Sequence, residues 1–176
     1  VSVEPATGHI KAWVGGIDYK HFQYDNVGQS RRQVGSTFKP FVYATALRLG
    51  AEPCDEFPNQ KTCIDLPPGS DPPRWCPDNS DEDYGEMVTL EYGRGNSMKT
   101  VTAKLIKDYG TRRVIDLAHA LGIESDIPNV PSIALGVAQL TLRELVSANA
   151  SLVNQGVYVQ PTFIARIEDR YGNAIY

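Results

Sequence analysis

A serine and a lysine three residues apart form the most reactive pattern in the sequence, within Gly35-Ser36-Thr37-Phe38-Lys39-Pro40. Residues at i and i+3 lie on one face of a helix, so the Ser36 hydroxyl and the Lys39 amine can come within reach of each other. A serine hydroxyl needs a neighbouring base, and a lysine can be that base when burial or nearby cations keep it neutral. The pair therefore indicates acyl transfer through Ser36, although a capping serine beside a solvated lysine would give the same short pattern.

A helix must carry this pair. Apolar residues recur at helical spacing from Phe38 to Leu49, which predicts a helix over residues 36–49 that ends at Gly50. Pro40 falls in or near the first turn, where a missing N–H costs little.

The remaining elements follow from pattern and turn residues. Strands are predicted at residues 1–3 and 10–14 around a turn at 5–8, with a surface loop over 17–33. Thr141 and Glu144 match a capping box, which predicts a helix over 142–154. Further segments are predicted from periodicity alone: helices at 90–92, 97–109 and 112–121, a connector at 132–137, strands at 157–159, 163–168 and 174–176, and a turn at 171–173.

Composition is consistent with one domain or part of one. The chain has 176 residues, 41% of them hydrophobic, and a net charge of -4 with the charges scattered. Without a basic stripe, nucleic acid is not an expected partner. The sequence contains no run of about 18 apolar residues, the length that a membrane-spanning helix needs.

Residues 51–86 contain seven of the 12 prolines and all three cysteines, Cys54, Cys63 and Cys76. This stretch, called the excursion below, is predicted to be long and irregular, and a disulfide could tie it. The sequence does not decide which cysteines pair. The cysteine spacing does not fit a zinc site, and the acidic run of Asp78 and residues 81–83 lacks EF-hand spacing, so no metal is predicted.

Three segments resemble the transpeptidase domain of penicillin-binding proteins, especially the class A, bifunctional high-molecular-weight type. Residues 31–43 are similar to the family's active-site helix, residues 4–16 to its opening hairpin, and residues 135–161 to a later helix and strand. The resemblance implies an α/β fold in which an antiparallel sheet is flanked by helices, as in serine β-lactamases and transpeptidases. Residues 1–176 would be a C-terminally truncated, partial transpeptidase domain.

The family's second motif, Ser-x-Asn, falls by position at Ser97-Met98-Lys99. The resemblance implies that Ser97 relays a proton to the leaving nitrogen. Lys99 stands where asparagine is expected, and an ammonium group cannot accept a hydrogen bond as an amide oxygen does. A second cation near Lys39 could instead lower the pKa of that lysine. Ser36, Lys39 and Ser97 are thus the predicted catalytic residues, and Gly35 and Lys99 the predicted substrate-binding residues.

The third family motif, Lys-Thr-Gly, does not occur in the 176 residues. In the family it supports the oxyanion hole, so residues 1–176 alone are expected to be impaired or inactive. The resemblance implies a serine D,D-transpeptidase that needs no cofactor, acts on peptidoglycan stem peptides and is acylated by β-lactams. Its parent would be membrane-anchored, attached to a glycosyltransferase domain, and active on the periplasmic face of the inner membrane.

Two other functions stay open. Lys99 and the missing third motif are compatible with a non-catalytic module that binds β-lactams or peptidoglycan. A serine β-lactamase would need a base that activates water for deacylation, and none is identified in the sequence. Tyr19, Phe22 and Tyr24, which precede the active-site helix, could line the active-site cleft or pack against neighbours.

Overall fold

The structure is a computed structural model that describes residues 1–80, 82 and 84–175. Its contacts divide the chain into two compact units. The first unit comprises Val1–Arg32, Ala118–Ser125 and Leu140–Tyr176, and the second comprises Gln33–Leu117 and Asp126–Gln139. Asp81 and Asp83 of the predicted acidic run lie outside the described residues, as does Tyr176 at the end of the last predicted strand.

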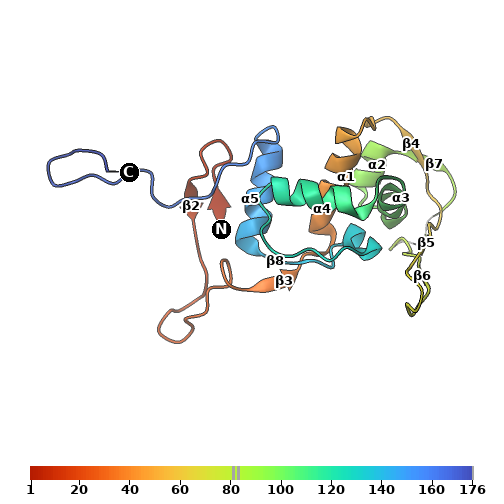
Figure 1. The fold of residues 1–176 in the computed structure, drawn as a ribbon, viewed down its shortest axis with the longest axis horizontal. Helices are drawn as coiled ribbons and strands as arrows, with labels where there is room; N and C mark the ends of the chain where they lie inside the picture. Colours follow the sequence, from red (N-terminus) through yellow and green to blue (C-terminus); the bar gives the residue numbers. More distant parts are fainter. Residues whose placement is uncertain (81, 83, 176) are drawn as a thin grey trace. The chain divides into compact units, whose positions relative to one another are not determined.

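Three helices pack together in the second unit: α1 (Lys39–Arg48), α2 (Leu90–Gly95) and α3 (Lys99–Tyr109) (Figure 1). A short 3-10 helix, η2 (Pro131–Leu135), contacts both α3 and the turn that precedes α1. The side chains between these elements are fully buried, and they include Phe38, Phe41, Val42, Val101, Leu105 and Ile133. This core holds α1 against α3, whose N-terminal ends carry the predicted catalytic residues.

The predicted helix over residues 36–49 is confirmed, but its first turn is the 3-10 helix η1 (Gly35–Phe38) and the α-helix ends at Arg48. Pro40 explains the tighter first turn. In an α-helix its N–H would donate to the carbonyl of Ser36, but proline has no N–H. The N–H of Lys39 donates to the Ser36 carbonyl instead, and this i to i+3 bond defines a 3-10 turn.

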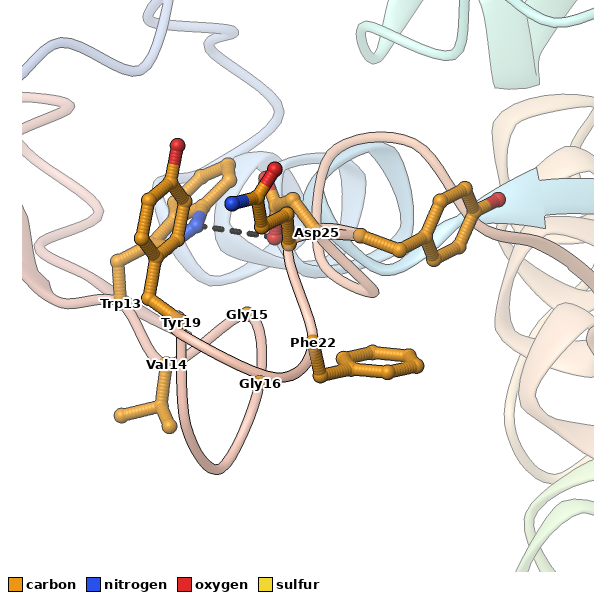
Figure 2. A pocket seen from close by; sticks show the side chains of 9 residues that line it. Trp13, Val14, Gly15, Gly16, Tyr19, Phe22 and Asp25 are labelled. Atoms are coloured by element: carbon orange, nitrogen blue, oxygen red, sulfur yellow. Dashed lines mark hydrogen bonds between the residues drawn. The ribbon is translucent and has the colours of Figure 1, made fainter.

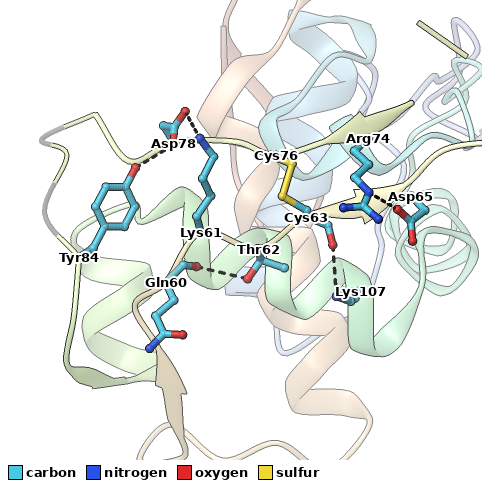
Figure 3. The surroundings of a disulfide bond; sticks show 10 residues. All are labelled: Gln60, Lys61, Thr62, Cys63, Asp65, Arg74, Cys76, Asp78, Tyr84 and Lys107. Atoms are coloured by element: carbon cyan, nitrogen blue, oxygen red, sulfur yellow. Dashed lines mark hydrogen bonds and ion pairs between the residues drawn. A yellow bond between two sulfur atoms is a disulfide. The ribbon is translucent and has the colours of Figure 1, made fainter. Parts of the chain in front are cut away.

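The excursion is more ordered than predicted. Its strand β4 (Glu56–Pro58) pairs antiparallel with β7 (Met87–Thr89), and β5 (Ile64–Asp65) pairs antiparallel with β6 (Arg74–Trp75). A disulfide joins Cys63 to Cys76 next to the second ladder (Figure 3), and Cys54 is exposed and free. The suggested disulfide tie is present, but the prediction of an irregular segment is wrong where two short ladders organise it.

The opening hairpin of the first unit is confirmed, with β1 (Ser2–Val3) antiparallel to β2 (Ile10–Ala12). The segment after it is a loop, as predicted, until β3 (Arg31–Gln33) pairs with β8 (Gln139–Thr141).

The predicted capping box is also confirmed. Thr141 and Glu144 satisfy each other's backbone amides at the start of α5 (Leu142–Val153), which contacts β1. The predicted helices elsewhere correspond to α2, α3 and α4 (Thr111–Ala120), and the predicted connector is η2.

The strands predicted at residues 157–159 and 163–168 and from residue 174 onward are wrong. Within the described part of this segment, pairing is limited to isolated bridges between His9 and Thr162 and between Glu168 and Ala174. Alternating apolar residues form a strand only when a neighbour supplies a continuous ladder of hydrogen bonds, and a single bridge is not a ladder. The turn at 171–173 is present, closed by the Gly172 amide on the Asp169 carbonyl.

Candidate active site

The Lys39 amine is buried and held by Ser97. The Lys39 side chain has 1% of its surface exposed, and its Nζ donates to the hydroxyl of Ser97 at 2.8 Å and also to the Ser97 carbonyl. Both residues belong to the second unit. Ser36 lies one turn before Lys39 and is exposed. The lysine head is therefore out of bulk water, while the predicted nucleophile is accessible.

Ser97 lies in the short connection between α2 and α3, and its backbone there is unusual. Its φ of 54° is in the left-handed region, which costs a non-glycine residue about 1–3 kcal/mol. The amide of Ser97 donates to the Arg94 carbonyl, and the amide of Met98 to the Gly93 carbonyl. These bonds hold the reversal in which both the carbonyl and the hydroxyl of Ser97 reach the Lys39 amine.

The environment of Lys39 lowers its pKa from 10.5 to about 8. Burial is the largest cause, because it disfavours the charged form, and the positive charges of Lys99 and Arg94 add to it. With a pKa of about 8, roughly one amine in ten is neutral at pH 7, compared with fewer than about one in a thousand for an ordinary lysine. Lys39 can therefore serve as a base near neutral pH.

The turn before Ser36 is fixed by contacts between two glycines, Gly35 and Gly136. The Gly35 amide donates to the Gly136 carbonyl at 2.9 Å, and the Val34 amide to the Ala138 carbonyl at 3.2 Å. Gly35 has φ +57° and Gly136 φ +72°, both in the left-handed region. A Cβ on Gly136 would lie 1.9 Å from the Gly35 carbonyl oxygen, so a side chain there is excluded.

The structure brings some predicted site residues into contact and leaves others apart. Lys39 and Ser97 are hydrogen-bonded, but among the described residues no hydrogen bond joins the hydroxyl of Ser36 to Lys39. The Lys99 backbone amide donates to Asn79 Oδ1, and the charge of its side chain lowers the pKa of Lys39. Gly35 contributes backbone only.

Sequence reasoning missed Arg94, Gly136 and Asn79. Arg94 is in α2 and acts on Lys39 through its charge. Asn79 follows Pro77 and Asp78, a combination typical of a turn, and only its burial, with 5% of its surface exposed, reveals a structural role. Gly136 could have been suspected, since a glycine after an apolar connector often has a left-handed backbone.

Three aromatic residues before the active-site helix line a pocket of the first unit that contains none of the predicted catalytic residues, so their predicted place in the active-site cleft stays a prediction. Tyr19, Phe22 and Tyr24 are 76%, 47% and 49% exposed and surround a cavity of about 420 Å³ together with Trp13 (Figure 2). The Trp13 indole donates to Asp25 Oδ1 at 3.2 Å and fixes one wall.

Within the described residues, no three metal-binding side chains lie close enough to hold an ion. None of the helices in the described part of the chain is long and apolar enough to cross a bilayer.

Comparison with known proteins identifies the family. A family model for the penicillin binding protein transpeptidase domain matches residues 1–175. Penicillin-binding protein 1A of Rickettsia prowazekii is 34% identical over 174 residues, which cover 99% of this chain and 22% of that protein. Penicillin-binding protein 1A of Escherichia coli is 32% identical over 180 residues, which cover 100% of this chain and 21% of that protein.

Solved structures of penicillin-binding proteins have the same fold as this chain. Penicillin-binding protein 1A from Haemophilus influenzae superimposes with a TM-score of 0.88 at 28% identity, covering 99% of this chain and 26% of that one. PonA1 from Mycobacterium tuberculosis, solved with penicillin V, has the same fold, with a TM-score of 0.82 at 23% identity and coverage of 99% of this chain and 48% of that one.

The chain therefore belongs to the penicillin-binding protein transpeptidase family, which confirms both the resemblance and the predicted fold class. It spans about a fifth of the length of the curated relatives described above.

Proposed function

We propose that this chain carries the acylation centre of a serine D,D-transpeptidase that cross-links peptidoglycan stem peptides. The observation that carries the proposal is the buried Lys39 amine, hydrogen-bonded to Ser97 and with its pKa lowered to about 8 by burial and neighbouring cations. A neutral amine one helical turn from an exposed serine can act as the base of that serine once the two side chains come within hydrogen-bond reach. Membership of the family supports the same reaction class.

In the first half-reaction, Ser36 Oγ attacks the penultimate D-Ala carbonyl of a stem peptide, and the neutral Lys39 amine takes the hydroxyl proton. The Ser36 backbone N–H supports the developing oxyanion. When the tetrahedral intermediate collapses, the C–N bond breaks, and the proton passes from Lys39 through the Ser97 hydroxyl to the leaving D-Ala nitrogen. The products are an acyl ester on Ser36 and free D-Ala.

In the second half-reaction, an amine of a neighbouring stem attacks the ester carbonyl and loses a proton to the Lys39 amine. The ester C–O bond breaks, the proton returns to Ser36 Oγ, and a new peptide bond joins the two stems. A β-lactam would acylate Ser36 by the first half-reaction and stay bound, because its leaving nitrogen remains tethered.

The hydrogen bonds of Lys39 suit this role. A neutral amine has two N–H groups and one lone pair. If the two N–H groups are donated to the carbonyl and hydroxyl of Ser97, the lone pair is left for the proton of the nucleophile. Ser97 would thus orient the base as well as relay its proton.

Residues 1–176 alone are expected to acylate slowly, because their sequence contains no Lys-Thr-Gly to complete the oxyanion hole. The Cys63–Cys76 disulfide supports an extracytoplasmic location for the parent protein, since such bonds persist in oxidising compartments. A membrane anchor and a glycosyltransferase domain in that parent are part of the same proposal.

The test is covalent labelling of the full-length protein with a fluorescent penicillin. We expect a label that is released slowly, that is absent from Ser36→Ala, and that is retained by a control, Ser2→Ala, in the exposed strand β1. Rapid release would indicate a β-lactamase instead. Reversible binding without a covalent label would favour a non-catalytic binding module, the alternative that Lys99 in place of asparagine suggests.

A further inference from the structure

The start of α3 is capped by a residue from the excursion. Met98, at the N-cap position, has no side-chain hydrogen bond to the helix. The first two amides of α3 donate instead to Oδ1 of Asn79, from Lys99 at 3.0 Å and from Thr100 at 3.2 Å. An asparagine oxygen that accepts from the first turn is a strong helix cap wherever it stands in the sequence.

Asn79 belongs to a buried polar network in the second unit. Its Nδ2 donates to Asn59 Oδ1 at 2.8 Å, and the Thr100 hydroxyl lies 2.9 Å from the same oxygen. Asn59, Asn79 and Thr100 have 4%, 5% and 0% of their surfaces exposed. Buried hydrogen-bonded amides of this kind allow one arrangement and penalise others, because any displacement leaves a polar group unpaired.

The excursion is tied down just before Asn79. Three residues earlier, the disulfide joins Cys76 to Cys63, whose carbonyl accepts from Lys107 in α3 (Figure 3). Asp78 pairs with Lys61 at 2.7 Å and accepts from the Tyr84 hydroxyl. The excursion thus contacts α3 near both ends: Asn79 accepts from the amides of its first turn, and the Cys63 carbonyl accepts from Lys107 in its last turn.

Ser97 lies two residues before the first of the two amides that Asn79 holds. Its other side is fixed by the last carbonyls of α2, and its own φ of 54° is not a conformation that serine prefers. Without a cap at α3, this connection can relax toward an ordinary backbone, and the carbonyl and hydroxyl of Ser97 would turn away from Lys39.

We propose that Asn79 is a positioning residue that holds the α2–α3 connection so that Ser97 faces the Lys39 amine. The excursion is then part of the catalytic apparatus without contacting substrate: it acts on Ser97 through the first amides of α3. This inference rests on the proposed function, since its readout is the acylation of Ser36.

The test compares Asn79→Ala and Asn79→Ser in the full-length protein during labelling with a fluorescent penicillin at saturating concentration. The rate constant of labelling reports the geometry of the site, and the amplitude reports the fraction of molecules that are folded and competent. We expect the rate constant of Asn79→Ala to fall at least about 10-fold, since misplacing a catalytic group by about 1 Å can cost more than that. Asn79→Ser keeps an oxygen acceptor and should recover part of the rate.

A purely structural role would give a different result. If Asn79 only stabilises the fold, Asn79→Ala lowers the amplitude while the molecules that label do so at the rate of the unchanged protein, and the proposal is overturned. Thr141→Val, which removes a cap from α5 in the first unit, is the matched control and should lower only the amplitude.

Two further outcomes are separable. If Asn79→Ala does not fold, the deciding measurement is hydrogen exchange of the Lys99 and Thr100 amides in Asn79→Ser, compared with the original protein. Unchanged exchange would mean that Asn79 does not hold these amides, and the proposal would be refuted. If the unchanged protein is not labelled on Ser36, the proposed function fails and this inference fails with it. Labelling on Ser36 with a rate indifferent to Asn79 refutes the inference alone.

Discussion

The helices α3 and α5 solve the same problem at their first turns in opposite ways. At α5, Thr141 and Glu144 satisfy the free amides from within the helix start itself. At α3, the acceptor is Asn79, 20 residues before Lys99 and part of a disulfide-tied excursion. The capping box itself is local, although Glu144 also accepts hydrogen bonds from Ser125 and Glu124, whereas the α3 cap comes only from a distant residue. The helix start that carries the predicted chemistry is the one without a local side-chain cap.

Among the variants that test this contrast, a substitution of Glu144 should have the largest effect. Its buried carboxylate accepts hydrogen bonds from the Thr141 amide and hydroxyl, the Ser125 amide and hydroxyl, and the Glu124 amide. We expect Glu144→Ala to lower the free energy of unfolding by about 3 kcal/mol, because several buried donors lose their acceptor at once. Denaturant unfolding measures this loss. A change below about 1 kcal/mol would show that the cap matters little.

The pH dependence of acylation is the next largest effect. Because the Lys39 pKa is lowered to about 8, the neutral base is lost as pH falls through that value, and we expect the labelling rate constant to drop about 100-fold from pH 9 to pH 6. A rate that stays flat between pH 6 and pH 9 contradicts the role of Lys39.

The stabilisation by Glu144 depends on pH in a different range. Burial opposes ionisation of Glu144, but its hydrogen bonds lower the pKa to about 2, so its stabilisation is complete above the ordinary value of 4.5 and is lost toward pH 2.

Thr141→Ala isolates the hydroxyl of the α5 capping box. Thr141 Oγ1 accepts from the Glu144 amide at 3.2 Å, and its loss should cost about 1 kcal/mol of stability, measured by thermal unfolding. The labelling rate constant should not change, since α5 starts in the first unit. An altered rate constant would show that local caps, too, tune the chemistry.

Lys99→Asn gives the smallest effect. Removing this charge should raise the pKa of Lys39, so the midpoint of the rate profile moves to higher pH, by less than burial contributes. The control Lys104→Asn makes the same change within α3 at a lysine that is paired with Asp108. Equal shifts in both variants would mean that the effect is general rather than local to Lys39.

The sequence predicted the parts of this fold that are local. The capping box was readable because both partners lie within four residues, and the helix of Ser36 and Lys39 because its apolar residues repeat. The contact between Lys39 and Ser97 spans 58 residues and was not predicted; the family resemblance indicated only that Ser97 relays a proton. The Asn79 cap lay beyond local patterns, because an asparagine among prolines reads as a turn whether or not a helix later docks on it.

The two glycines near the nucleophile also have a consequence for how the chain matures. The Gly35 amide donates its hydrogen bond to a carbonyl about 100 residues later, and the backbones meet so closely that no side chain fits between them. If Ser36 reacts as proposed, it can do so only after that distant segment has docked, which is a slow, non-local event during folding. A penicillin label would then report only fully folded molecules, and newly made protein would become reactive after its helices have formed.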